Sequence, residues 1–145
     1  MAFQFSLETV LRLRGIAEQR EERAMEDILR NMAQQRQHLM DLASDRAQLV
    51  QRCDTVLQAK VPVAELVLLQ GQIQVTKDRE ADGRKQLAHL EEQRQAQMKV
   101  YETAHRNREL LSRMREQHLE QFRRAQTRKE QMQMDDLFSC RRTSA

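Results

Sequence analysis

Apolar side chains recur every three or four residues through the first half of the chain, the spacing that places them on one face of a helix. Read as heptads, this half has eight apolar residues among ten a and d positions. The ten positions are Met25, Ile28, Met32, Gln35, Leu39, Leu42, Arg46, Leu49, Cys53 and Val56, and the e positions add Leu29, Ala43, Val50 and Leu57. A heptad pattern that continues over several repeats predicts a coiled-coil helix.

Local sequence features mark the beginning of this first helix. Ser6 is a favoured N-cap residue, and Glu8 then lies in the first turn, where the helix dipole stabilises a negative charge. Phe5 and Val10 occupy the two positions of a hydrophobic staple. The a and d positions are polar over residues 18–23, so we expect this stretch to be the weakest part of the helix.

The single proline, Pro62, predicts where the chain reverses. Proline disfavours helical backbone at the residue before it, yet it fits the first turn of a following helix. The sequence therefore predicts a first helix over about residues 6–58 and a break over about 59–63. A second helix is predicted over about 64–138, followed by a flexible tail.

The second helix carries a looser heptad pattern than the first. Its apolar positions are Leu66, Leu69, Ile73, Leu87, Leu90, Tyr101, Ala104, Leu111, Phe122, Ala125 and Met132. Charged residues interrupt the pattern at Glu80, Arg94, Arg108 and Arg115, and Gly83 takes a d position. Two arrangements are open to these charged groups: they pair across the hairpin or, as we expect, they extend towards water along the helix surface.

Two long helices joined by one short loop predict an all-α fold, a long antiparallel two-helix coiled-coil hairpin. With a rise of 1.5 Å per residue, the predicted lengths are roughly 75 and 110 Å, so the first helix covers the second only to about residue 115. The rest forms a C-terminal helix overhang without a partner in the chain, with apolar residues at Leu119, Phe122, Ala125, Met132, Met134, Leu137 and Phe138. A partner protein, or a second copy of the chain, is expected to cover it.

Composition agrees with this fold and excludes several function classes. Aromatic residues make up 3% of the 145 residues, Trp is absent, and 32% are charged, so the chain cannot close a compact core around itself. Positive and negative residues alternate, and the net charge is only +3. A nucleic-acid platform would show a basic stripe with interleaved aromatic residues, so we expect no nucleic-acid binding.

The chain offers no recognisable catalytic, cofactor-binding or metal-binding pattern. No second His follows any His at the three- or four-residue spacing of a helical metal site, and no glycine-rich phosphate loop is present. Asp135 and Asp136 would lie on an unpaired helix without a cleft. Cys53 fits a small buried hydrophobe. The N-terminus does not resemble a signal peptide and no segment is apolar enough to cross a membrane, so we expect a cytosolic protein that is not an enzyme.

Both ends of the chain resemble the flagellar export protein FliJ family. The residues from Phe3 to Arg14 fit the pattern F-x-F-x-L-x-x-V-L-x-x-R. The residues from Arg128 to Asp136 fit the pattern R-[RK]-E-Q-x-x-[LM]-D-[ED]. The resemblance covers the whole chain, although the middle would match many coiled coils.

This resemblance implies a cytoplasmic, non-catalytic stalk, peripheral to the inner membrane at the flagellar base and similar to the central stalk of rotary ATPases. Its implied partners are the hexameric flagellar export ATPase and the cytoplasmic domain of the export-gate membrane protein, and family members are linked to handling of export chaperones. Matched by motif, the residues implied to contact the ATPase are Phe5, Leu7, Leu11, Arg14, Phe122, Arg124, Arg128 and Met132. Those implied to contact the gate are Leu69, Ile73, Thr76 and Glu80. The alternatives are the stalk protein of a virulence-type secretion system and a homodimeric coiled-coil scaffold.

Overall fold

The computed structural model describes residues 2–143 and contains two helices, with no strand in that range. Helix α1 runs from Glu8 to Gln58 and helix α2 from Val63 to Thr143, with 51 and 81 residues respectively. The two long helices pack against each other, which confirms the prediction of an all-α fold. The chain divides into two compact units, which we call the hairpin unit (Glu22–Val100) and the terminal unit (residues 2–21 and 101–143).

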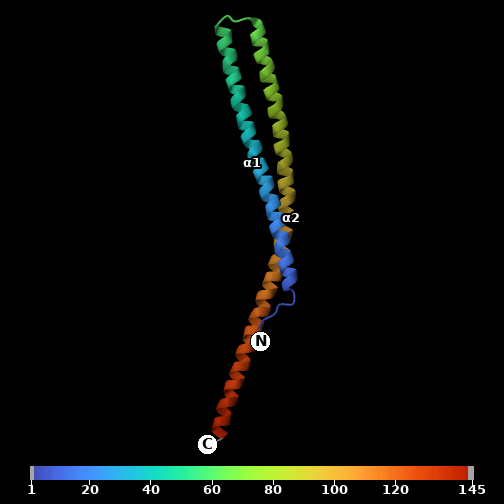
Figure 1. Cartoon of the computed structure of the whole chain (residues 1–145), viewed down its shortest axis with the longest axis vertical. Coiled ribbons are helices and arrows are strands. Elements are labelled where there is room, and N and C mark those ends of the chain that lie inside the picture. Colours follow the sequence, from blue (N-terminus) through green and yellow to red (C-terminus); the bar gives the residue numbers. More distant parts are fainter. Residues whose placement is uncertain (1, 144–145) are drawn as a thin grey trace. The chain divides into compact units, whose positions relative to one another are not determined.

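In the hairpin unit, the chain reverses between Gln58 and Val63, at the loop that joins α1 and α2 in Figure 1. Lys60 has a φ of 52°, the left-handed conformation that often follows the end of a helix. Pro62 precedes the first residue of α2, and its carbonyl accepts a hydrogen bond from the amide of Glu65 at 3.1 Å. The reversal therefore lies where the single proline predicted it.

The seam of the hairpin unit follows the predicted heptads of α1. All ten a and d positions from Met25 to Val56 are buried or half-buried, and Met32, Leu42 and Cys53 are the most enclosed. The four e positions listed by the sequence pattern are exposed instead. The a and d residues of α1 therefore form the narrow seam of a two-helix coiled coil. The apolar e residues beside them are left uncovered in this unit.

Helix α2 contributes a matching seam that is less apolar. Leu69, Thr76 and Glu80 are buried, and Gly83 lies where Leu39 and Gln35 of α1 approach closely. A Cβ atom at Gly83 would lie 2.7 Å from Cδ2 of Leu39, and the side-chain amide of Gln35 donates a hydrogen bond to the Gly83 carbonyl at 3.2 Å. Gly83 therefore permits close helix packing at this layer.

In the terminal unit, the residues before α1 pack onto α2. Helix α1 begins at Glu8 and not at Ser6, because the carbonyl of Leu7 accepts the first helical hydrogen bond, from the amide of Leu11 at 2.8 Å. Phe5 is 7% exposed, and its ring meets the ring of His118 edge-on at a centroid distance of 5.6 Å. Phe5 is therefore buried against α2, while the predicted staple partner Val10 is 39% exposed.

The part of α2 that the N-terminal residues cover extends further along the helix than the sequence predicts. Phe3 lies beside Phe122, with ring centroids 5.6 Å apart, because the segment before α1 extends cover beyond the helix itself. Leu119 and Phe122 are half-buried and so do not belong to the uncovered overhang. Beyond them, α2 continues to Thr143, past the helix end predicted near residue 138.

Candidate partner-binding surfaces

A buried carboxylate holds the N-terminal part of α1 against α2 in the terminal unit. Glu18 accepts hydrogen bonds from Nδ1 of His105 at 2.6 Å and from Nε of Arg108, and the His105 ring stacks on Tyr101. Burial raises the pKa of the Glu18 carboxyl, but the hydrogen bonds and positive charges of His105 and Arg108 outweigh burial, so the net pKa lies below its ordinary value. The polar stretch expected to be weak thus begins with a fully paired residue.

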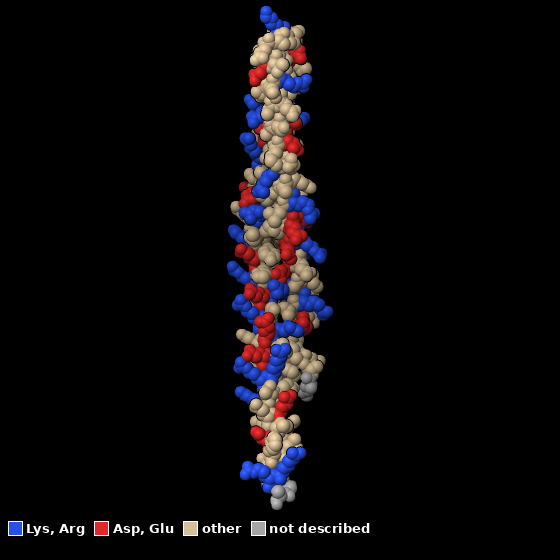
Figure 2. Space-filling view, turned by 90° about the vertical axis from the view of Figure 1, so that its left-hand side faces the viewer, with Lys and Arg blue, Asp and Glu red and all other residues tan. Residues whose placement is uncertain are grey.

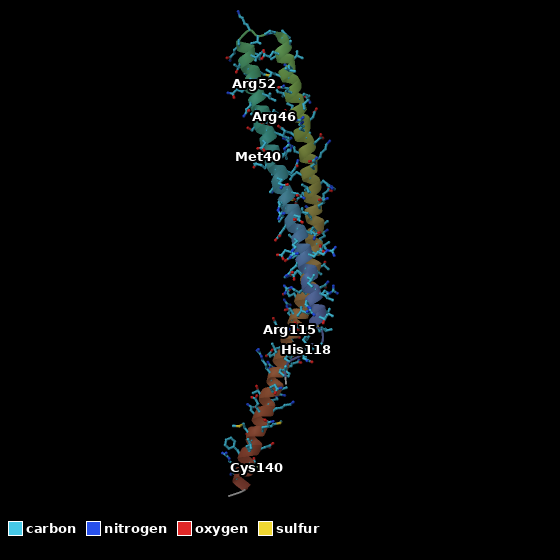
Figure 3. The ribbon with its side chains drawn as sticks, viewed as in Figure 1. Met40, Arg46, Arg52, Arg115, His118 and Cys140 are labelled. Carbon is cyan, nitrogen blue, oxygen red and sulfur yellow. The ribbon has the colours of Figure 1, made fainter. Side chains whose placement is uncertain are left out.

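Three of the four charges that interrupt the α2 pattern pair across the seam, contrary to the prediction that they extend towards water. Besides Arg108, Arg115 pairs with Glu8 at 2.9 Å, and Glu80 pairs with Nε of Arg46 at 3.0 Å. Figure 3 labels Arg46 on α1 and Arg115 on α2. Pairing is possible because an antiparallel seam places opposite charges at the same layer. Arg94, the fourth, pairs with Glu91 on its own helix at 2.6 Å.

The segment of α2 from residue 123 to 142, which we call the overhang, is exposed at every position except Gln126. Its large apolar side chains are Met132, Met134, Leu137 and Phe138, with exposed fractions of 67%, 53%, 63% and 58%. Six basic residues against three acidic ones give this segment a net charge of +3. Figure 2 shows acidic and basic residues interleaved over much of the visible surface. Basic and flexible apolar groups together suit an adaptable, charge-steered protein contact.

The eight residues implied to contact the ATPase divide into two sets in the terminal unit. Four of them, Phe5, Leu7, Leu11 and Phe122, are buried or half-buried. The other four, Arg14, Arg124, Arg128 and Met132, are exposed. Arg124 forms an ion pair with Glu120 on the same helix, whereas Arg128 has no ion pair within residues 2–143.

The four residues implied to contact the gate lie in the seam of the hairpin unit. Leu69, Thr76 and Glu80 are 7%, 8% and 4% exposed, and Ile73 is half-buried. Thr76 donates a hydrogen bond to the carbonyl of Gln72 at 2.9 Å. These side chains occupy a and d positions and pack in the seam, although Thr76 and Ile73 also line grooves on the surface of the unit. Their contact with the gate stays a prediction.

An exposed apolar groove lies beside those buried residues, in the same part of α2. It has a volume of about 770 Å³ and is formed by α2 with residues 45–52 of α1. Leu68 and Val75 line it with exposed fractions of 63% and 49%, and Gly71 between them leaves open space. The charged residues Asp45, Arg52 and Arg79 also line it. The heptad pattern identifies this groove only indirectly, because Leu68 and Val75 are apolar residues outside the a and d positions.

Residues 2–143 contain no group of three or more His, Cys, Asp or Glu side chains that could hold a metal ion. Cys53 is buried and Cys140 is exposed, far apart in sequence and in different units. Asp135 and Asp136 are exposed on the overhang. Within the same range, neither helix has a stretch apolar enough to cross a membrane.

Comparison with known families shows that a family model described as the flagellar FliJ protein matches residues 3–144. The chain belongs to the flagellar FliJ family. Its match covers both terminal patterns and everything between them, which accounts for the resemblance that the two ends showed. FliJ membership assigns the chain a role related to flagellar protein export. No curated protein and no solved structure gives a match.

Phe3 is the residue of this FliJ chain whose role sequence reasoning missed. It appeared in the N-terminal pattern but received no role, because it lies outside the helix and its heptads. Its contact with Phe122 depends on the path of six residues of non-helical or turn backbone, residues 2–7, before α1. A pair of aromatic residues at the two ends of a predicted hairpin, in a chain with only 3% aromatic residues, was the available indication.

Proposed function

We propose that this FliJ-family chain is a non-catalytic adaptor of the flagellar export apparatus that binds the export ATPase ring through its overhang. In this account it acts at the cytoplasmic face of the inner membrane and links the ATPase to the export gate. It thereby supports flagellum assembly, and with it motility and chemotaxis. The exposed overhang is the observation that carries the proposal.

The overhang supports an ATPase contact because three of the predicted contact residues are exposed on one face of it. Arg124, Arg128 and Met132 follow one another at four-residue spacing, so their side chains lie along the same side of α2. Four large apolar groups remain exposed on this segment, which is unfavourable in water and is relieved by a partner. Basic residues among them would steer an acidic ring surface towards the helix.

The buried members of the predicted set support this contact by a different route. Phe5 and Phe122 are packed against His118 and Phe3, so their side chains hold the N-terminal segment on α2. Glu18 adds a second attachment point within the terminal unit. We assign these buried residues to positioning the end of the molecule, and we assign direct contact to the exposed residues Arg14, Arg124, Arg128 and Met132.

For the gate contact we propose the exposed groove of the hairpin unit. Leu68 and Val75 offer apolar side chains that are open to a partner, and they lie next to the buried Leu69 and Thr76. The groove accommodates a short apolar segment of the gate's cytoplasmic domain, while Leu69 and Glu80 keep the two helices together. The two partners therefore bind separate units of the chain.

The proposal is tested by titrating the full chain with the purified export ATPase in a calorimeter. The double variant Arg128→Glu with Met132→Ala is expected to weaken binding at least tenfold, and to leave the melting curve unchanged because both side chains are exposed. Lys60→Glu in the hairpin loop serves as the matched charge control and should keep the affinity of the unaltered chain. Equal affinity for the double variant and this control would contradict the proposed contact.

The gate contact is tested separately with the cytoplasmic domain of the gate protein. Leu68→Ala with Val75→Ala should reduce capture of this domain and leave ATPase binding unchanged. Sedimentation of the free chain tests the remaining alternative, a homodimer through the overhang. A dimer that the Met132→Ala substitution dissociates, together with no ATPase binding, would favour the scaffold alternative.

A further inference from the structure

The hairpin unit has a second exposed apolar face, on the opposite side of α2 from the gate groove. Lys77 follows Leu68 by nine residues, which at about 100° per residue places the two side chains about half a turn apart. On α1, this second face carries the e positions that the two-helix seam does not use. Val50 and Leu57 are 44% and 63% exposed there.

A groove of about 460 Å³ runs along this face. Ala43, Ala47 and Val50 of α1 line one side, and Ile73 and Lys77 of α2 line the other, with Arg46 between them. Ala43 and Ala47 are four residues apart, so their methyl groups form one shallow row on which another helix can approach closely. An apolar stripe that occupies e as well as a and d positions is typical of helices that pack against more than one neighbour.

The charged side chains that line this groove, Arg46 and Lys77, are both positive. Arg84 lies two turns along α2 from Lys77, and its guanidinium is 3.7 Å from Glu80. The Glu80 carboxylate is buried between Arg46 and Arg84, with only 6% of its side chain exposed, so it offsets one of three positive charges without presenting a negative surface. Asp54 lies about one turn beyond Val50, so the middle of the face is the cationic part.

We propose that this face binds an amphipathic helix of a partner protein that carries Asp or Glu beside its apolar stripe. The partner's apolar side chains would cover Val50 and the two alanines, and its carboxylates would pair with Lys77 and Arg46. The result is a local three-helix bundle. This interaction is additional to the ATPase and gate contacts, because it uses neither the overhang nor the Leu68 groove.

The charge of the face argues against a second copy of the chain as the occupant. A symmetric dimer would place the same patch of each copy against the other, so Arg46 and Lys77 would face their own equivalents. Like charges brought together in an interface oppose binding. The small alanine side chains also fit a neighbouring helix better than a lipid surface, which is typically bound through large groups such as Leu, Phe and Trp.

Site-specific photo-crosslinking in cells tests this proposal with the full chain. A benzophenone amino acid at position 50 should give one dominant adduct, whose attached peptide, identified by mass spectrometry, comes from an acidic amphipathic helix. The same amino acid at Asp41, which is exposed and points about half a turn away from position 50, is the background control. Lys77→Glu should lower the adduct at least threefold, whereas Arg79→Glu, on the side of the gate groove, should leave it unchanged.

Several results would overturn the proposal. These are an adduct no stronger than the Asp41 control, an adduct with a second copy or with lipid, and an attached peptide that lacks acidic residues. An equal effect of Lys77→Glu and Arg79→Glu would also overturn it. If Lys77→Glu alters the melting curve, Lys77→Gln replaces it, because removal of the positive charge alone is expected to weaken the adduct.

Discussion

Two glycines in the hairpin unit predict opposite responses to the same substitution. Both lie inside α2, and neither has a positive φ, so alanine fits the backbone at either position. At Gly71 a Cβ atom meets nothing within 4 Å. Alanine should therefore stabilise the protein there by about 0.5–1 kcal/mol, the usual gain over glycine within a helix.

At Gly83 the same gain is opposed by overpacking, because the new Cβ would lie 2.7 Å from Cδ2 of Leu39 and 3.0 Å from Nε2 of Gln35. Both atoms end flexible side chains, so we take the low part of the usual overpacking cost, about 1–2 kcal/mol. The net expectation for Gly83→Ala is a loss of roughly 0–1.5 kcal/mol after the helical gain is subtracted.

Urea denaturation followed by circular dichroism measures both free energies of unfolding under the same conditions. The two alanine variants should differ by about 1–2 kcal/mol, with Gly83→Ala the less stable. A double-mutant cycle with Leu39→Ala should show coupling of at least about 0.5 kcal/mol, because both changes act on one contact. If Gly83→Ala stabilises the protein as much as Gly71→Ala, the close packing of this layer is refuted.

Three further predictions concern the terminal unit and the loop. Phe122→Ala should lower the free energy of unfolding by about 1–2 kcal/mol, because it removes the half-buried ring that contacts Phe3. Met132→Ala, at an exposed position, should leave the melting curve unchanged. Equal melting of both variants would argue against the contact between Phe3 and Phe122. Because folding lowers the pKa of Glu18, its contribution is complete above its ordinary pKa near 4.5 and falls as the pH drops through the lower folded value. Glu18→Gln should remove that acid-side loss from a pH series of unfolding free energies. Lys60→Gly should stabilise the loop by about 1 kcal/mol, since a left-handed φ is unfavourable for lysine; no gain in thermal stability would count against this backbone conformation.

The helical fold was predictable because its determinants are local. Heptad spacing from Met25 to Val56 identified the α1 seam residue by residue, and Pro62 located the reversal. In an antiparallel pair these two features also fix which residues of α2 face α1. The all-α prediction therefore needed no long-range information beyond the position of one loop.

The candidate site was predicted less well, because its residues depend on how segments distant in sequence meet. In the sequence, Glu18 and Arg108 are two separate polar interruptions of the heptad patterns. They form an ion pair only because the antiparallel packing of α1 on α2 brings them side by side. Phe122 was placed in the uncovered segment because helix lengths alone do not include the extended residues that bring Phe3 to it. The residues that the resemblance assigned to the gate contact fell on buried or half-buried heptad positions, because a sequence motif does not show which side of a helix faces its partner helix.

Hydrogen exchange of the full chain, with and without the export ATPase, tests the central claim most directly. Mass spectrometry of the exchanged peptides reports which backbone amides a bound partner protects. The account predicts new protection concentrated over residues 123–142, with none added in the loop over residues 59–62. Protection confined to the hairpin unit, or an overhang that exchanges equally fast with the ATPase bound, would contradict it.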